Sequence, residues 1–157
     1  MSFTDEEVTY LRSQRLARLA TVSPDGQPDA APVGYEFDGT YFYVGGRDPV
    51  KTRKFRNVRA GNAKVALVID DLVSTDPWTP RSLRVYGTAE IVQRQGRFGP
   101  GPYMRISPTI SWSSNLEGRP LAQGPPARRR TVHHAADPEE GQGRSIGMTT
   151  SSTTETT

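Results

Sequence analysis

The stretch from Ser82 to Gln93, SLRVYGTAEIVQ, decides the fold class, because apolar and polar side chains alternate along it. The apolar set is Leu83, Val85, Ala89 and Ile91, and the polar set is Arg84, Thr88 and Glu90. Successive side chains of a β-strand point to opposite faces, so this alternation predicts a strand with one buried and one exposed face. The protein is therefore predicted to be mainly β.

Further short strands are predicted on both sides of this stretch. They are expected at residues 16–23, 28–37, 40–44, 64–69 and 103–112, the last one interrupted at Pro108, with loops at 70–80 and 96–102. The run KVALVI, residues 64–69, is continuously apolar after its lysine, which is typical of a strand buried on both faces. Six short strands with one inserted helix favour a six-stranded antiparallel β-barrel, because closure removes exposed strand edges.

Length and composition predict a single folded domain followed by a tail. The chain has 157 residues, 15 Gly, 13 Pro and no Cys, so a disulfide framework and thiolate chemistry are excluded. Residues 1–118 are expected to fold, and residues 119–157, rich in Pro, Gly, Arg, Ser and Thr, are expected to be a largely disordered tail. No apolar run has the length of a membrane span, and the start of the chain is acidic, so a cytoplasmic protein without membrane contact is expected.

A basic segment between two predicted strands is the candidate anion site. A helix is predicted from Pro49 to Arg59, and on it Lys51 and Lys54 project within the apolar arc of Val50, Phe55 and Val58. One hypothesis is that both lysines, the helix start and the Thr52 hydroxyl bind a phosphate. The alternative is a solvated basic face, and Arg53 projects to the opposite side of the helix.

Other candidate sites are disfavoured. His133 and His134 are adjacent in the predicted tail, where neighbouring side chains do not face a common point, so neither a metal site nor a Ser/His/Asp triad is expected. Asp70 and Asp71 lack further oxygen ligands for a cation. Trp78 and Trp112 are typical of core or interface anchors. The net charge of +3 fits an anionic ligand, whereas a nucleic-acid-binding barrel is disfavoured because the arginine-rich tail lacks interleaved aromatics.

The order of short motifs resembles one flavoprotein superfamily. The motifs are RLATV at 18–22, DGQP at 25–28, APV at 31–33, KFRNV at 54–58, VALV at 65–68 and YGTAE at 86–90. In this order they resemble the pyridoxamine-5′-phosphate-oxidase-like, FMN-binding split β-barrel superfamily, and within it the actinobacterial branch that uses the deazaflavin coenzyme F420.

The resemblance implies a homodimer with the cofactor in a groove at the subunit interface. It implies that Ala31, Pro32 and Val33 lie against the cofactor ring and that Thr52, Arg53 and Lys54 bind its phosphate. Lys51 from the helical wheel and Val44 on the preceding strand complete the candidate cofactor site, and no metal is expected.

The expected function is F420-dependent hydride transfer to a small unsaturated or quinone-like substrate. The alternatives are an FMN-dependent oxidoreductase on the same fold and a non-catalytic flavin- or F420-binding protein. The catalytic residues are left open: the proton comes from solvent or from Tyr41, Tyr43 or Tyr86, because the cofactor carries the main chemistry.

Overall fold

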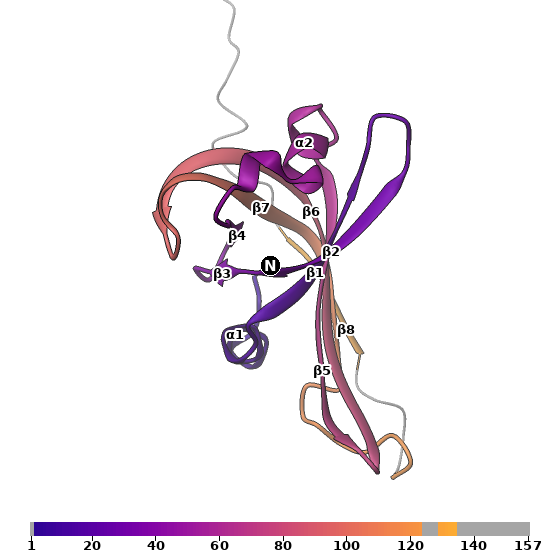
Figure 1. Ribbon diagram of the computed structural model, residues 1–157. Coiled ribbons are helices and arrows are strands. Elements are labelled where there is room, and N and C mark those ends of the chain that lie inside the picture. Colours follow the sequence, from indigo (N-terminus) through magenta and orange to yellow (C-terminus); the bar gives the residue numbers. More distant parts are fainter. Residues whose placement is uncertain (1, 124–128, 135–157) are drawn as a thin grey trace, which may run out of the picture.

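The computed structural model describes residues 2–123 and 129–134, which form one curved antiparallel sheet with two α-helices (Figure 1). The helices are α1 (Asp5–Ser13), the 3-10 helix η1 (Pro49–Lys51) and α2 (Arg53–Arg59). The strands are β1 (Leu16–Val22), β2 (Pro28–Gly34), β3 (Glu36–Phe37), β4 (Phe42–Val44), β5 (Lys64–Thr75), β6 (Trp78–Gly96), β7 (Gly99–Ser114) and β8 (Arg129–His133).

The sheet has eight strands in the order β2-β1-β5-β6-β7-β4-β3, with β8 paired to β7. The mainly β, antiparallel prediction is confirmed, but six strands and a closed barrel are wrong. The predicted strand 28–37 is split at Tyr35 into β2 and β3, which pair with β1 and β4 respectively. One chain segment thus supplies both ends of the strand order, and the sheet curls strongly without closing.

The two predicted loops at 70–80 and 96–102 are mostly strand. The pairing of β5 with β6 continues to Thr75 opposite Trp78, so these strands form a long ribbon, and the segment that follows β7 runs beside the end of this ribbon (Figure 1). Near its end Leu72 and Val73 are both exposed, so no single buried face imposes an alternating pattern on the sequence. Asp71, which was expected in a loop, lies on β5, where its carboxylate accepts hydrogen bonds from the Arg81 guanidinium and the Tyr10 hydroxyl.

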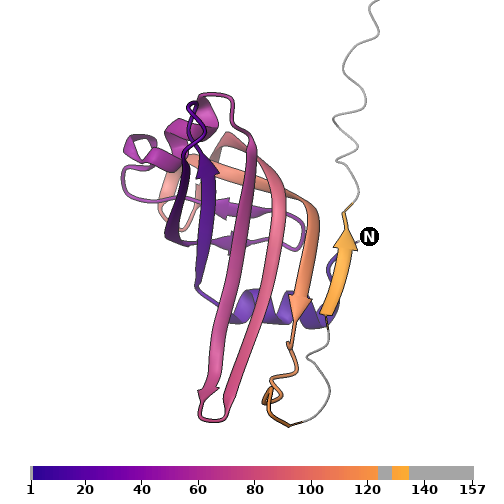
Figure 2. The ribbon, with the colours of Figure 1, turned by 90° about the vertical axis from the view of Figure 1, so that its right-hand side faces the viewer.

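The core lies on the concave side of the sheet. It joins Leu19 of β1, Leu67 of β5 and Val85 of β6 to Leu11 of α1 and Phe55 of α2. The opposite face of β1, β5 and β6 carries no helix, and it is turned toward the viewer in Figure 2. We call it the outer face.

The predicted helix from Pro49 to Arg59 is interrupted. It divides into η1 and α2 at Thr52, which has extended backbone angles and donates its hydroxyl to the Pro49 carbonyl over 2.5 Å. Phe55 and Val58 are buried as the helical periodicity predicts. Because η1 and α2 are separate helices, a single helical wheel over residues 49–59 does not give the directions of all the basic side chains in this segment.

Part of the predicted tail is a strand. β8 pairs with β7, and Val132 is 1% exposed. The backbone N–H of His134 donates to the Thr109 carbonyl, and its Nε2 forms a 2.8 Å hydrogen bond with the Ser111 hydroxyl. The expectation that both histidines lie outside the folded part is therefore wrong. Residues 135–157 lie outside the described residues, and none of the helices within the described part has the length and apolarity to cross a membrane.

Gly87 allows a close approach of two backbones. The register of β6 with β7 shifts between Tyr86 and Gly87, and a Cβ on Gly87 would meet the Ser107 carbonyl oxygen at 2.6 Å. We expect Gly87→Ala to lower the free energy of unfolding by about 1–3 kcal/mol, because backbone atoms must move. Gly46→Ala is the matched control, since its Cβ meets nothing within 4 Å. Urea unfolding of both variants measures the difference, and equal losses would contradict the close approach.

His134 makes stability depend on pH. Burial lowers the pKa of His134 below its ordinary value of 6.5, so the unfolded chain binds this proton more readily than the folded one. Its contribution is complete above pH 6.5 and is lost as the pH falls below that value. We expect His134→Gln to flatten the stability profile between about pH 5 and 7, as measured by urea unfolding at a series of pH values.

Candidate functional site

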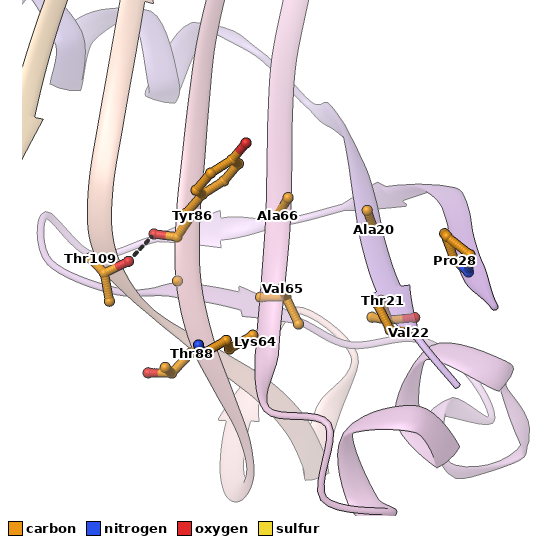
Figure 3. A pocket seen from close by; sticks show the side chains of 11 residues that line it. Ala20, Thr21, Val22, Pro28, Lys64, Val65, Ala66, Tyr86, Thr88 and Thr109 are labelled. Atoms are coloured by element: carbon orange, nitrogen blue, oxygen red, sulfur yellow. Dashed lines mark hydrogen bonds between the residues drawn. The ribbon is translucent and has the colours of Figure 1, made fainter. Parts of the chain in front are cut away.

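A hollow of about 490 Å³ lies on the outer face (Figure 3). This volume lies in the range of small-molecule sites. Its lining residues come from β1, β5, β6 and β7 and the start of β2: Ala20, Thr21, Val22, Pro28, Lys64, Val65, Ala66, Tyr86, Gly87, Thr88 and Thr109. Most of this lining is apolar. We call it the hollow.

Small side chains in register create the floor of the hollow. Ala20 of β1 lies opposite Ala66 of β5, and Ala66 lies opposite Tyr86 of β6. Tyr86 is 46% exposed and rises beside this floor. A planar ligand can therefore lie flat on the alanines with the phenol ring as a side wall.

A bulge in β7 holds Tyr86 in place. Tyr86 pairs with Ile110 and Gly87 pairs with Pro108, so Thr109 has no opposite residue on β6. The Thr109 hydroxyl instead donates to the Tyr86 carbonyl over 2.9 Å, drawn as a dashed line in Figure 3. The Thr109 carbonyl accepts a hydrogen bond from the backbone N–H of His134, so the residue after β8 also contacts the bulge.

The hollow offers one cation and several hydroxyls. Of the described residues that line it, Lys64 alone is charged at neutral pH. Thr88 and the Tyr86 phenol add hydroxyl groups that can donate to polar edges of a ligand. The Thr21 hydroxyl is buried and accepts a 3.0 Å hydrogen bond from the Asn57 amide of α2.

A second cavity of about 370 Å³ lies between α2 and the β1–β2 turn, and we call it the α2 depression. It is lined by Ser23, Asp25, Gln27, Arg53, Arg56 and Asn57. A hydrogen bond from Ser23 lowers the pKa of Asp25, with Arg53 as a smaller cause. Asn57 belongs to this lining and also binds Thr21 of the hollow, so the walls of the two cavities are joined.

Of the predicted phosphate-binding residues, one lines a described cavity and three do not. Arg53 lines the α2 depression. Lys51 is exposed and Lys54 is half-buried, and neither lines the hollow or the α2 depression. The Thr52 hydroxyl donates a hydrogen bond to the Pro49 carbonyl. Arg56, three residues after Arg53 on α2, lines the α2 depression together with it.

The predicted ring-binding residues do not line the hollow. On β2, Pro32 is exposed, Ala31 is half-buried, and Val33 is only 6% exposed. Val44 is completely buried in the core, so its side chain does not reach the surface. Lys64, Ala20 and the bulge were missed by sequence reasoning, because a strand pattern does not reveal which small residues share a register.

Tyr86 differs from the other two tyrosines considered as proton donors. It alone of the three lines the hollow. Tyr43 is 8% exposed, burial raises its pKa, and its ring is covered by the Arg94 guanidinium at 3.8 Å. Tyr41 lies beside Tyr43 and under Arg105. In the described residues no three acidic or histidine side chains gather in a way that could hold a metal ion.

Comparison with known proteins identifies relatives of this chain. A reductase of 5a,11a-dehydrotetracycline and 5a,11a-dehydrooxytetracycline from Streptomyces rimosus is 46% identical over 100 residues, which cover 62% of this chain and 69% of that protein. A solved structure named F420 reductase is 27% identical with a TM-score of 0.50, covering 62% of this chain and 89% of that one. A conserved hypothetical protein from Mycobacterium tuberculosis shares the fold, with 22% identity, a TM-score of 0.60 and coverage of 78% and 90%.

The family model described as pyridoxamine 5′-phosphate oxidase matches residues 3–137, which is most of the chain. The match includes all the strands that build the hollow and the helix that builds the α2 depression. The protein therefore belongs to the pyridoxamine 5′-phosphate oxidase family.

Proposed function

We propose that this oxidoreductase binds coenzyme F420 and reduces a small unsaturated molecule in the hollow. The observation that carries the proposal is the hollow itself, an apolar floor of small residues with an aromatic side wall and a single lysine. A tricyclic ring needs a flat apolar surface and a few polar groups at its edge, and the lining has both. The relatives named as reductases support the same class of reaction.

The residues present fit a ligand that carries an anionic chain. The Thr21–Asn57 hydrogen bond joins the hollow to the α2 depression, where Arg53 and Arg56 supply two guanidinium groups. Guanidinium groups bind phosphate through charge-assisted and often bidentate hydrogen bonds. Lys64 adds a third positive charge at the hollow. A cofactor whose ring lies on the alanine floor of the hollow and whose phosphate lies in the α2 depression would occupy both cavities.

The chain's own part in the reaction is to orient and to shield. The cofactor, when bound, supplies the hydride chemistry. Ala20 and Ala66 set the height at which a ring lies on the sheet, and Tyr86 fixes its lateral position. The Tyr86 hydroxyl, or solvent, provides the proton that completes the reduction of a double bond. The relative's activity on dehydrotetracyclines supports a substrate with such a reducible double bond.

Two alternatives share these cavities. FMN also combines a flat tricyclic ring with a phosphate, so an FMN-dependent oxidoreductase uses the same hollow. A non-catalytic carrier of either cofactor binds without turnover. Titration of the purified protein with F420 and with FMN in parallel separates the cofactors, and consumption of reduced cofactor with an unsaturated tetracycline separates enzyme from carrier. Preferred binding of FMN would contradict F420 dependence.

We further propose a homodimer with a cytoplasmic location. The support for the dimer is the outer face: beside the hollow it carries the exposed Tyr86 and Val22 and the half-buried Trp112, and it is covered by no other element in the described part of the chain (Figure 2). Exposed aromatic and aliphatic side chains in such number are typical of an interface.

The first variant tests the anion site. We expect Arg53→Gln to weaken F420 binding by about 1–3 kcal/mol, because a charge-assisted hydrogen bond to phosphate is lost. Arg59→Gln, on the same helix but outside the α2 depression, is the matched control and leaves the affinity unchanged. Lys54→Ala in the same fluorescence titration tests whether the family-implied phosphate set extends to that residue. Equal effects of Arg53→Gln and Arg59→Gln would indicate diffuse electrostatics instead.

The second variant tests the floor of the hollow. We expect Ala66→Leu to reduce cofactor affinity at least about tenfold, since three added carbon atoms occupy the space of the ring. Ala122→Leu places the same side chain at an exposed position outside the hollow and is expected to bind normally. Thermal unfolding of both variants excludes a general loss of folding, and normal binding by Ala66→Leu would place the cofactor elsewhere.

A further inference from the structure

A row of side chains on the outer face lies next to the hollow. Val68 of β5 is opposite Arg84 of β6, and Arg84 is opposite Trp112 of β7. Arg84 precedes Tyr86 by two residues on β6, so both face the same side of the sheet with their Cα atoms about 6.6 Å apart. Neither Arg84 nor Trp112 lines the hollow itself. We call these two side chains the Arg84–Trp112 platform.

Aromatic rings hold the guanidinium group of Arg84 in place. Its central carbon lies 4.7 Å from the centre of the Trp112 ring and 5.8 Å from the centre of the Tyr86 ring. The two rings meet edge to face, with their centres 4.8 Å apart and their planes at 78°. A cation over an aromatic face is attracted by the negative charge of that face. The three side chains therefore form one packed group, which places a positive charge beside the wall of the hollow.

Arg84 forms no ion pair with a carboxylate in the described part of the chain, although its side chain is half-buried. Arg18, which lies opposite Val68 in the same row, instead forms an ion pair with Asp70 at 2.8 Å. Removing water from a charged group costs free energy, and a counter-ion offsets that cost. An anionic group on a ligand would supply the partner that Arg84 lacks.

We propose that the Arg84–Trp112 platform is the substrate subsite and that it selects planar conjugated molecules that carry an ionised oxygen. Arg84 binds this oxygen through charge-assisted hydrogen bonds, and Trp112 packs against the conjugated system. The inference rests on the proposed function, in which the cofactor ring lies on the alanine floor. It adds to that function a class of substrate and a specificity-determining residue, Arg84.

The place of the platform suits a substrate that lies over the cofactor ring. One face of that ring rests on Ala20 and Ala66, so only the opposite face is open to the substrate. Tyr86 and Arg84 stand in adjacent rows at the same side of this floor. A substrate over the ring thus meets the phenol and the guanidinium along one edge, and its ionised oxygen lies on the Arg84 side.

A cation at this edge also favours the reaction. Reduction by hydride adds negative charge to the substrate before a proton arrives from the Tyr86 hydroxyl or from solvent. This charge is especially costly on a substrate that is already an anion. A guanidinium beside the conjugated oxygen offsets it, and the effect is strong where water is scarce. The platform therefore favours anionic over neutral members of one class of compounds.

Two quinones that differ in a single group test this selectivity. Lawsone, a hydroxynaphthoquinone, is an anion at neutral pH, whereas its methyl ether has the same rings and no charge. The chain has no cysteine, so neither quinone forms a thiol adduct with it. Calorimetric titrations use the protein loaded with oxidised F420 and the protein alone. We expect the dissociation constant of lawsone to be lower than that of its methyl ether by about tenfold or more.

The matched variants assign this preference to one residue. We expect Arg84→Gln to raise the dissociation constant of lawsone about tenfold or more and to leave that of the methyl ether unchanged. Arg18→Gln is the control, because it removes the same charge from the same row and is expected to keep the preference. Equal binding of the two quinones by the wild type, or an unchanged preference in Arg84→Gln, would overturn the assignment. An equal loss in Arg18→Gln would overturn it too, since this face would then attract anions in general.

The two proposals fail differently. If the wild type binds neither F420 nor FMN, the proposed function fails, and titration of the protein alone with both quinones still decides whether Arg84 selects the anion. If the wild type binds cofactor but does not distinguish lawsone from its methyl ether, the substrate subsite fails and the cofactor site stands.

Discussion

Hydrogen bonding at the two ends of one chain segment constrains the whole molecule. β2 and β3 are separated only by Tyr35, yet β2 pairs with β1 and β3 pairs with β4. A flat sheet would hold these partners several strands apart, about 4.8 Å for each strand crossed. The sheet must therefore curl, and its concave side receives the core. Tyr35 secures the bend, since its buried hydroxyl donates to the Leu11 carbonyl of α1 over 2.5 Å.

The curl also decides where a ligand can lie. Both helices and the core occupy the inner side or the ends of the curled sheet, so the outer face of β1, β5 and β6 stays available (Figures 1 and 2). On that face, small residues in register form the hollow, and one buried hydrogen bond ties it to the basic surface of α2. The site is thus assembled from backbone geometry and small side chains, which suits a cofactor that carries its own reactivity.

β8 also contributes to the candidate site, because it pairs with β7. Thr109, in the bulge beside Tyr86, donates its hydroxyl to the Tyr86 carbonyl, and its own carbonyl accepts from the backbone N–H of His134, directly after β8. A strand beyond the predicted domain boundary therefore contributes to the wall of the candidate site. Its composition hides this role, because only Val132 among its five residues is apolar and the arginines around it resemble a solvated tail.

By itself the sequence determined the mainly β class, the strands with one buried face and the family, because alternation and motif order are local properties of the chain. It also placed Arg53 in a basic segment that the family resemblance predicts to bind phosphate. Only the tertiary structure decided that β2 and β3 are separate strands, that the ribbon replaces a loop, and that Lys64, Arg56 and Tyr86 line cavities while Val44 is buried. These depend on which distant strands share a register and how far the sheet curls, and no local pattern encodes either.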